Sequence, residues 1–322
     1  MSEQYTYAVA RVRSMENSLF SDSVIEQLIN CKDEGQAIAF LEEKGWGELA
    51  NSSNSEDILK SEEEKTWATV KELGVPMEKF DVLSYPKWFH NVKAAIKANG
   101  MDQPDWQYFY DEIPLTKDKV MQIIKEKDYS ALPEFMREAA QEANETFLHT
   151  KDGQLCDIIL DKATLDAIYQ CGKESKEEII EIYAETTVAV ANIKIAVRSQ
   201  MTKKSLSFVK RSLAHCDTLN IERLAKATQI NEAAIIEYLE ETIYKDGADA
   251  LKESPSVFEC WCDNQLIKIL APQKYNPFTI GPVFAYVIAR ENEIKTVRII
   301  LSGIRNQLPE EEIRERVRKM YV

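Results

Sequence analysis

A short motif returns at a fixed distance along the chain, and this spacing is the strongest constraint on how the chain can fold. Asn91-Val92-Lys93 reappears as Asn192-Ile193-Lys194, and Glu293-Ile294-Lys295 stands one step further on. Both steps are 101 residues, since 192 − 91 = 101 and 293 − 192 = 101. A fixed period indicates one supersecondary unit that is used several times. We therefore expect comparable units along the chain.

The sequence downstream of the motif keeps the same phase. Val120 falls on Ile221, because 120 + 101 = 221, and each opens an apolar helical pattern shortly after a threonine, Thr116 or Thr218. We accordingly divide the chain into three lobes. Their ranges are 1–86 with 285–322, which brings the termini together, then 87–186, then 187–284.

The local pattern of the sequence is helical. Glycine and proline are scarce, at ten each, and strong helix formers are abundant. Apolar residues recur at helical spacing over 176–200, 231–244 and 283–304, whereas no segment alternates strictly between apolar and polar residues. The fold class predicted is all-α.

Four segments interrupt this pattern. The segment 51–65 is polar and acidic and is predicted to be an exposed loop or linker. The segments 98–114, 244–256 and 270–282 contain proline, glycine or both and are predicted to be further breaks.

The net charge of the chain argues against nucleic acid as a partner, and its short apolar stretches argue against a membrane-spanning helix. The net charge is −14, so the phosphates of a nucleic acid would be repelled on average. The longest uncharged apolar stretch, 275–289, contains two prolines and is shorter than the about 20 residues of a spanning helix. With no secretory signal in the opening residues, we expect a cytosolic protein whose six cysteines are reduced.

The C-terminal segment holds charged residues on an apolar helical stripe. Val287, Ile294 and Leu301 are seven residues apart, and Glu291 and Arg298, also seven apart, are placed on that same stripe. A charged side chain on a buried face needs an opposite charge. Glu291 and Arg298 are therefore expected either to bind a partner in another lobe or protein, or to extend into solvent at the edge of the stripe.

A second, shorter helix is expected at the extreme C-terminus. Gly303 is predicted to end the long helix, and Pro309 fits the first position of the next one. Acidic residues fill its first turn, while Arg314 and Arg316 lie near its end, an arrangement that suits the helix dipole. A basic interaction face is the alternative interpretation.

Signatures of catalysis and of cofactor or metal binding are not found. The chain has no GxxxxGK[ST] or GxGxxG loop that would cradle phosphates. Cys260-Trp261-Cys262 is a CxC, not the CxxC of structural zinc, and His90, His149 and His215 are the only histidines available to a Cys–His pair. The aromatic residues Trp106, Tyr108, Phe109 and Tyr110 are predicted to be core that fastens a loop, with a recognition patch as the alternative.

Two stretches resemble a known family. The run YVIARENEIKTVRIILSGIRNQLPEEEIRERVRKMYV (286–322) resembles the C-terminal signature of the C subunit of archaeal and bacterial V/A-type rotary ATPases, which corresponds to the d subunit of the eukaryotic vacuolar enzyme. The opening YAVARVRSMENSLFSDSVIEQL (7–28) looks like the N-terminal segment of that family. The resemblance is diffuse between these ends. Gly303-Ile304-Arg305 departs slightly from the Gly-Lys that the family often has there.

The resemblance implies an all-helical funnel of three similar lobes with pseudo-threefold arrangement. It implies a non-catalytic central-stalk subunit without cofactor or metal, a socket between the D- and F-type rotor shaft and the membrane proteolipid ring. Such a subunit transmits torque for ATP-coupled ion transport, hydrogen ions among them, and is peripheral on the cytoplasmic side. The candidate partner-binding residues are Arg11, Arg13, Glu291, Arg298, Arg314 and Arg316.

Two other functions are weighed against this one. An all-helical repeat scaffold for protein binding would have units of about 30–45 residues, much shorter than the observed period. A helical enzyme would need a concave polar site with perturbed titrating groups, and the sequence offers no such constellation.

Overall fold

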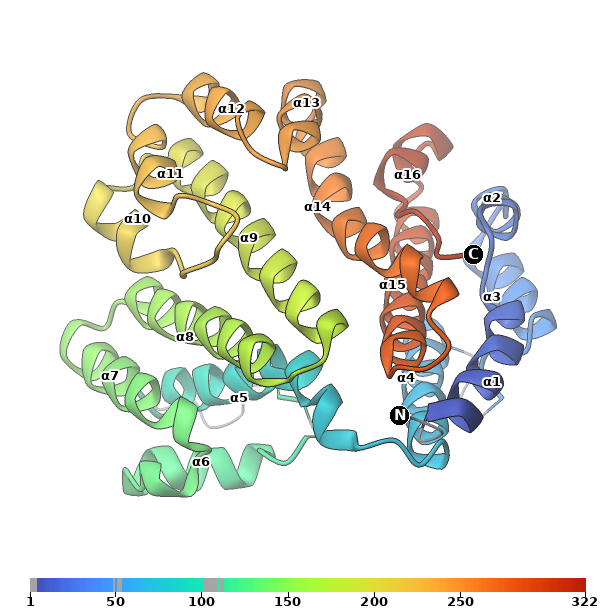
Figure 1. Cartoon of the computed structure of the whole chain (residues 1–322), viewed down its shortest axis with the longest axis horizontal. Coiled ribbons are helices and arrows are strands. Elements are labelled where there is room, and N and C mark those ends of the chain that lie inside the picture. Colours follow the sequence, from blue (N-terminus) through green and yellow to red (C-terminus); the bar gives the residue numbers. More distant parts are fainter. Residues whose placement is uncertain (1–4, 49, 51–53, 101–108, 111–112) are drawn as a thin grey trace. The chain divides into compact units, whose positions relative to one another are not determined.

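The computed structural model describes residues 5–48, 50, 54–100, 109–110 and 113–322. Every regular element in these residues is a helix and none is a strand (Figure 1), which confirms the all-α prediction. The helices are α1 (Thr6–Met15), α2 (Asp22–Ile29), α3 (Glu34–Glu43), α4 (Ser55–Glu72), α5 (Asp81–Gly100), α6 (Lys117–Glu126), α7 (Glu134–Thr150), α8 (Gly153–Glu174), α9 (Glu178–Met201), α10 (Leu206–Ser212), α11 (Ile221–Ala227), α12 (Glu232–Glu240), α13 (Lys245–Glu253), α14 (Pro255–Leu270), α15 (Gly281–Arg305) and α16 (Glu310–Arg316).

The described residues form two compact units. Unit 1 takes residues from 1–77, 177–179 and 246–322, and unit 2 takes 78–176 and 180–245. The N-terminal and C-terminal helices therefore belong to the same unit. The division into three lobes, and their arrangement as a funnel, remain predictions.

Unit 1 is built around α15. This helix contacts α1, α2, α3, α4, α14 and α16, and Figure 1 shows it among them. Every residue from Ile280 to Arg290 is buried. Such a helix is apolar around most of its circumference, and a helix of that kind is stable only when other helices enclose it. Val287, Ile294 and Leu301 are all buried, as the apolar stripe predicts.

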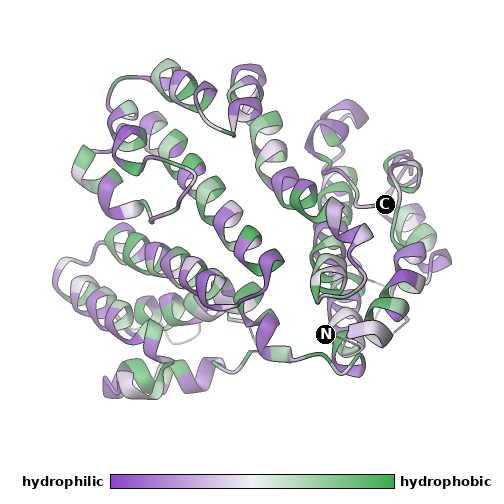
Figure 2. Ribbon diagram, in the orientation of Figure 1, coloured by the Kyte–Doolittle hydropathy of each residue, from purple (hydrophilic) through white to green (hydrophobic). Residues whose placement is uncertain are grey.

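Unit 2 has its main core between α5, α6, α7 and α8. Large buried side chains such as Phe89, Ile96, Ile124 and Phe147 fill it. A smaller cluster around Val209 joins α10 to its neighbours. No described helix of the chain is both long and apolar enough to cross a membrane. Figure 2 shows apolar and polar residues interspersed along each helix, as expected when only one face is buried.

The helices follow the period of the sequence motif. α4, α8 and α14 begin at residues 55, 153 and 255, and the helices that follow each of them begin at 81, 178 and 281. Each of these later helices carries one copy of the motif, and its first residue, Asn91, Asn192 or Glu293, is fully buried. The first residue of the motif is thus buried in all three helices.

The two asparagines of the repeated motif perform the same structural task. Asn91 accepts a hydrogen bond from the backbone N–H of Tyr110 at 2.8 Å and donates to the carbonyl of that residue at 2.8 Å. Asn192 does the same to Ala214, at 2.9 and 2.8 Å. A buried backbone group without a partner is unfavourable, so an amide that both donates and accepts is well suited to these positions. Glu293 can only accept when ionised, and it accepts from the N–H of Phe20 at 2.7 Å.

One predicted break is wrong, and a second is much shorter than predicted. The described part of 51–65 is mostly helix, since α4 begins at Ser55 after Asn54, whose side chain accepts from the N–H of Asp57 at 2.8 Å. The polar residues there form a capped first turn, and Ile58 further along is buried. Most of 244–256 is also helical, because α13 and α14 meet at a single junction, where Ser254 caps α14.

Gly172 lies where α8 passes close to α9. A Cβ atom at this position would stand 2.4 Å from the Cβ of Ala184, so a side chain would force the helices apart. We expect Gly172→Ala to lower the free energy of unfolding by about 2 kcal/mol in urea denaturation. Gly153→Ala in the same helix is the control, because its Cβ would meet only Lys97 Cε at 3.7 Å. Equal stability of the two variants would contradict a close helix contact at Gly172.

Candidate functional site

The charged residues singled out in the sequence all lie in unit 1, on three helices. Arg11 and Arg13 are on α1, Glu291 and Arg298 on α15, and Arg314 and Arg316 on α16. A role in partner binding remains a prediction for all of them. Their surroundings show which of them are committed to contacts within the chain.

The short helix α16 packs directly on α15. Gly303 was predicted to end the long helix, and this is wrong, because α15 continues to Arg305. A Cβ at Gly303 would lie 2.7 Å from Cγ1 of Ile313, and Ile313 is buried. The glycine therefore permits close contact between the two helices instead of breaking one of them.

The two arginines of α16 form ion pairs at the surface. Arg314 contacts Glu26 of α2 and Glu310 of its own helix, both at 3.1 Å, and the hydrogen bond with Glu26 raises its pKa. Arg316 lies 3.9 Å from Glu312. These pairs are partly exposed and therefore contribute little rigidity.

The two arginines of α1 differ in their surroundings. Arg13 donates to both oxygens of Glu16, at 2.7 and 2.8 Å, and to the carbonyl of Gln273 at 2.7 Å. It therefore ties α1 to the segment before α15. Arg11 is exposed, which leaves it the better placed of the two for contact with another protein.

Glu291 and Arg298 lie at the edge of the buried stripe. The Arg298 side chain is 50% exposed, and its Nε lies 3.6 Å from Glu56 of α4. Glu291 is partly buried. For Arg298 the structure matches the second interpretation of the sequence, a side chain that reaches solvent and pairs there.

A fully buried charge network includes Arg290, the residue before Glu291, and was not among the sites predicted from the sequence. Nη2 of Arg290 lies 2.5 Å from Glu62 of α4, and Nη1 contacts Glu293. The guanidinium also stacks over Trp46, 5.1 Å from the ring centroid. The exposed fractions of Glu62, Arg290 and Glu293 are 1%, 5% and 0%. The network joins α4 to α15 across a sequence separation of 228 residues.

In this network, burial favours the protonated form of Glu293, whereas the positive charge of Arg290 favours its ionised form. Burial raises the pKa of Glu293 to about 7, and the nearby Glu62 carboxylate contributes to the rise. Arg290 and the N–H of Phe20 act in the opposite direction. Outside the buried part, Lys65 lies 3.9 Å from Glu62. Two carboxylates thus share one buried guanidinium, which favours the protonated form of the more deeply buried acid.

Cys260, Cys262 and His215 are each buried or in contact with another residue of the chain. Cys260 lies 3.1 Å from the carbonyl of Val317, and Cys262 is buried. His215 lies 3.5 Å from Asp217 on the surface of unit 2. In the part of the chain that the structure describes, no three His, Cys, Asp or Glu side chains are placed to hold a metal ion.

The aromatic segment can be followed only in part. Trp106 and Tyr108 lie outside the described residues. Phe109 packs against the core of unit 2, whereas Tyr110 is 44% exposed and held by Asn91 through its backbone. The sequence prediction of core packing therefore fits Phe109 and does not fit the Tyr110 side chain.

Comparison with known proteins relates most of the chain to one family. Residues 8–316 match the family described as ATP synthase (C/AC39) subunit. A Methanocaldococcus jannaschii protein, named as the C subunit of an A-type ATP synthase, is 24% identical, over 96% of this chain and 85% of the relative. An Enterococcus hirae protein, named as the C subunit of a V-type sodium ATPase, is 22% identical, over 96% and 97%. A Thermococcus kodakarensis protein, named as the C subunit of an A-type ATP synthase, is 22% identical, over 97% and 89%.

Proposed function

The chain belongs to the ATP synthase (C/AC39) subunit family, and from this premise we propose that it is a non-catalytic socket that joins the soluble rotor shaft to the membrane proteolipid ring. The match over residues 8–316 carries the proposal, because it extends through both units. The partners are shaft subunits of the D and F types and the ring. The chain transmits torque between them.

A part that transmits torque must resist deformation. In unit 1, α15 is surrounded by six other helices, and the buried charge network fixes it to α4. Close-packed interiors have low compressibility, and helices that pack ridges into grooves slide past one another only with difficulty. These properties suit a coupling element.

The proposed location is the cytoplasmic side of the membrane, with the chain attached to the complex as a peripheral subunit. The chain would contact the ring through its surface, and ion pairs at such a contact would fix the register of the two parts more than their affinity. The arginines of α16 are candidates for this contact, because they are partly exposed and held by surface ion pairs.

The direct test is reconstitution of the rotary complex with and without the chain. We expect the chain to co-purify with the shaft pair and the ring. Without it, the soluble part should hydrolyse ATP while ion transport into vesicles is lost. A complex that couples hydrolysis to transport equally well without the chain would overturn the proposal.

Charge reversal on α16 tests the proposed contact face. We expect Arg314→Glu with Arg316→Glu to reduce either assembly or the ratio of ions transported to ATP hydrolysed by about tenfold, since like charges across an interface are strongly unfavourable. The variant itself should stay folded, because both side chains are partly exposed. Co-purification and vesicle transport give the readout.

The matched control reverses two exposed lysines of α6. Lys119→Glu with Lys125→Glu makes the same change in net charge on unit 2. Normal coupling in this control and loss in the α16 variant would assign the effect to α16. Normal coupling in both would remove α16 from the proposed interface.

A further inference from the structure

A long groove follows α8 within unit 2, and the socket function does not require it. One cavity of about 220 Å³ lies between the start of α5 and the end of α8. A second of about 620 Å³ lies between α7, α8 and α10. The two cavities share Phe135, Ala167 and Gln170 in their linings, so they are adjoining parts of one groove.

A row of apolar residues runs along the floor of the groove. Ile159, Ala163, Ala167 and Cys171 line it and are spaced four residues apart, which places them along one face of α8. From the first to the last of these residues the helix rises about 18 Å at 1.5 Å per residue. The small side chains leave room for another backbone to approach.

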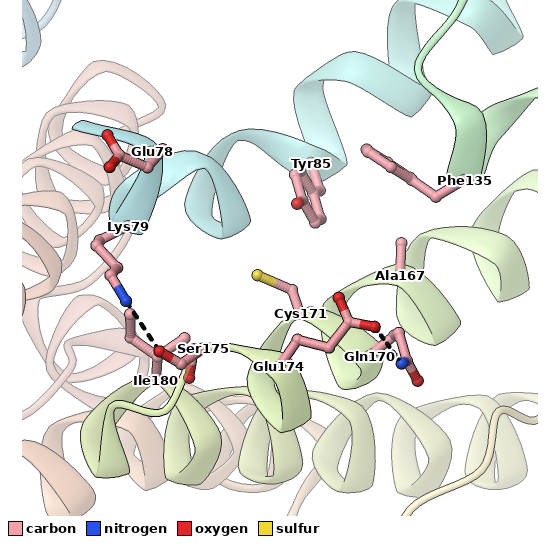
Figure 3. A pocket seen from close by; sticks show the side chains of 10 residues that line it. All are labelled: Glu78, Lys79, Tyr85, Phe135, Ala167, Gln170, Cys171, Glu174, Ser175 and Ile180. Carbon is pink, nitrogen blue, oxygen red and sulfur yellow. Dashed lines mark hydrogen bonds between the residues drawn. The ribbon is translucent and has the colours of Figure 1, made fainter. Parts of the chain in front are cut away.

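An exposed aromatic side chain forms one wall. Phe135 of α7 is 42% exposed, and its ring centroid lies 4.8 Å from that of Tyr85. Figure 3 shows Tyr85 and Phe135 on one side of the smaller cavity, with Cys171 and Ala167 of α8 facing them. An aromatic wall above a floor of small residues fits the apolar face of a helix.

The smaller cavity is acidic. Glu78 and Glu174 line it. Burial and the adjacent Cys171 raise the pKa of the Tyr85 hydroxyl, and the carboxylates of Asp81 and Glu174 contribute to the rise. Within the part of the chain that the structure describes, Glu174 accepts a hydrogen bond only from a neutral donor, Gln170, at 2.5 Å.

The basic residues of the groove are already engaged within the chain. Lys79 donates to the carbonyl of Ser175 at 2.9 Å. In the larger cavity each cation faces an acid. The pairs are Lys162 with Asp166 at 2.5 Å, Lys210 with Glu222 at 2.6 Å, and Arg211 with Glu142 at 3.5 Å. Lys79 keeps its positive charge when it donates to a carbonyl, but Glu78 and Glu174 line the same cavity, so the net charge of the smaller cavity is negative.

We propose that this groove binds one amphipathic α-helix of a partner protein, whose apolar face lies over Ala163, Ala167 and Phe135 while an arginine or lysine enters the acidic cavity. The cation would lie between Glu174 and the ring of Tyr85, where a carboxylate and an aromatic face both attract it. In this mode of recognition, the side chains that enter the groove recur every three or four residues along the bound helix. Binding of such a helix needs only the isolated chain and is independent of the socket role.

The test uses the full chain and a labelled synthetic peptide. The peptide is held helical, is about 16 residues long (about 24 Å at 1.5 Å per residue), carries leucine and alanine on one face, and has a single arginine in its last turn. Fluorescence anisotropy is expected to show binding. Replacing the arginine with neutral citrulline should weaken binding about tenfold, because a charge-assisted contact is lost. A scrambled peptide of the same composition should bind far more weakly.

Variants locate the binding to the groove. Glu174→Gln should bring the arginine and citrulline peptides to nearly equal affinity, whereas Glu237→Gln on α12 should leave their ratio unchanged. Ala163→Trp should fill the groove and abolish binding. Saturating peptide should slow alkylation of Cys171 about tenfold, as burial of a thiol does, while alkylation of Cys31 in unit 1 keeps its rate.

Three results would each overturn the proposal. Equal binding of the helical and scrambled peptides would mean that the acidic chain attracts any cationic peptide. An unprotected Cys171 would place the peptide elsewhere. A dimer of the chain in sedimentation that Ala163→Trp dissociates would assign the groove to a second copy.

Discussion

Arg290→Met is expected to destabilise the protein by about 3–5 kcal/mol, because it removes the cation that the buried Glu293 contacts and leaves Glu62 only the partly exposed Lys65 at 3.9 Å. Glu62 and Glu293 are 1% and 0% exposed, and both contact this one guanidinium. Methionine fills a similar volume, so the loss reports the charge and not a cavity. Urea denaturation at about pH 8, above the pKa of about 7 that Glu293 has in the folded protein, is the measurement.

Two further variants separate the charge effect from other causes. Arg298→Met on the same helix removes a half-exposed arginine and should change stability by no more than about 0.5 kcal/mol. Adding Glu62→Met and Glu293→Gln to Arg290→Met should restore most of the stability, since an uncharged replacement of a buried ion network is often neutral. A single Arg290→Met variant as stable as the wild type would show that the network does not hold α15 to α4.

The helical character of the chain could be predicted because it is local. The apolar spacing over 176–200 and 283–304 corresponds closely to α9 and α15. The period of the apolar residues shows which face of a helix is buried, and both α9 and α15 bury a large apolar face. The predicted start at Thr116 also agrees, since α6 begins at the next residue.

The start of α4 could not be predicted by the same means. The segment 51–65 opens with a run of serine and asparagine, whose side chains favour turns and helix caps over helix interiors. What makes it helical is burial: Ile58 and Glu62 face α15, and the partner of Glu62 is 228 residues away in the chain. Contacts of that range leave no local signal.

Glu291 and Arg298 lie outside the buried network for a geometric reason. Glu291 and Arg298 follow the stripe residues Val287 and Ile294 by four positions, and four residues at 3.6 per turn overshoot a full turn by about 40°. This moves both side chains towards solvent. Arg290 precedes Glu291 and points inwards, where it is buried.

The buried network did have a signal in the sequence. Glu293 occupies the repeat position that Asn91 and Asn192 occupy in the other copies, and both asparagines are fully buried. An acid that takes the place of a buried amide needs a cation nearby. Arg290, three residues earlier, is at the spacing that places two side chains on one face of a helix.

The same glutamate should make stability depend on pH. Its pKa is about 7 in the folded protein, against an ordinary value of 4.5. Because the folded pKa is the higher one, the favourable contribution is complete below about 4.5 and is lost as the pH rises through about 7. Each pKa unit corresponds to about 1.4 kcal/mol, so the loss is on the order of 3 kcal/mol.

Glu293→Gln removes the titration and should flatten this dependence. The substituted amide would be neutral at every pH and can still accept from the N–H of Phe20, as the asparagines do at their own positions. Its altered contact with Arg290 lowers the free energy of unfolding by an amount that does not depend on pH. Relative to the wild type, the variant should therefore gain on the order of 3 kcal/mol between about pH 4.5 and about pH 8.

Urea denaturation of both proteins across this range measures the difference directly. Glu311→Gln on the exposed first turn of α16 is the control and should follow the wild-type curve. Taking the difference between variants cancels the titration of all other groups, provided that they are distant from the substituted residue. If the curves of Glu293→Gln and the wild type run parallel from acid to alkaline pH, Glu293 is ionised throughout, and the buried guanidinium outweighs the effect of burial on its carboxylate.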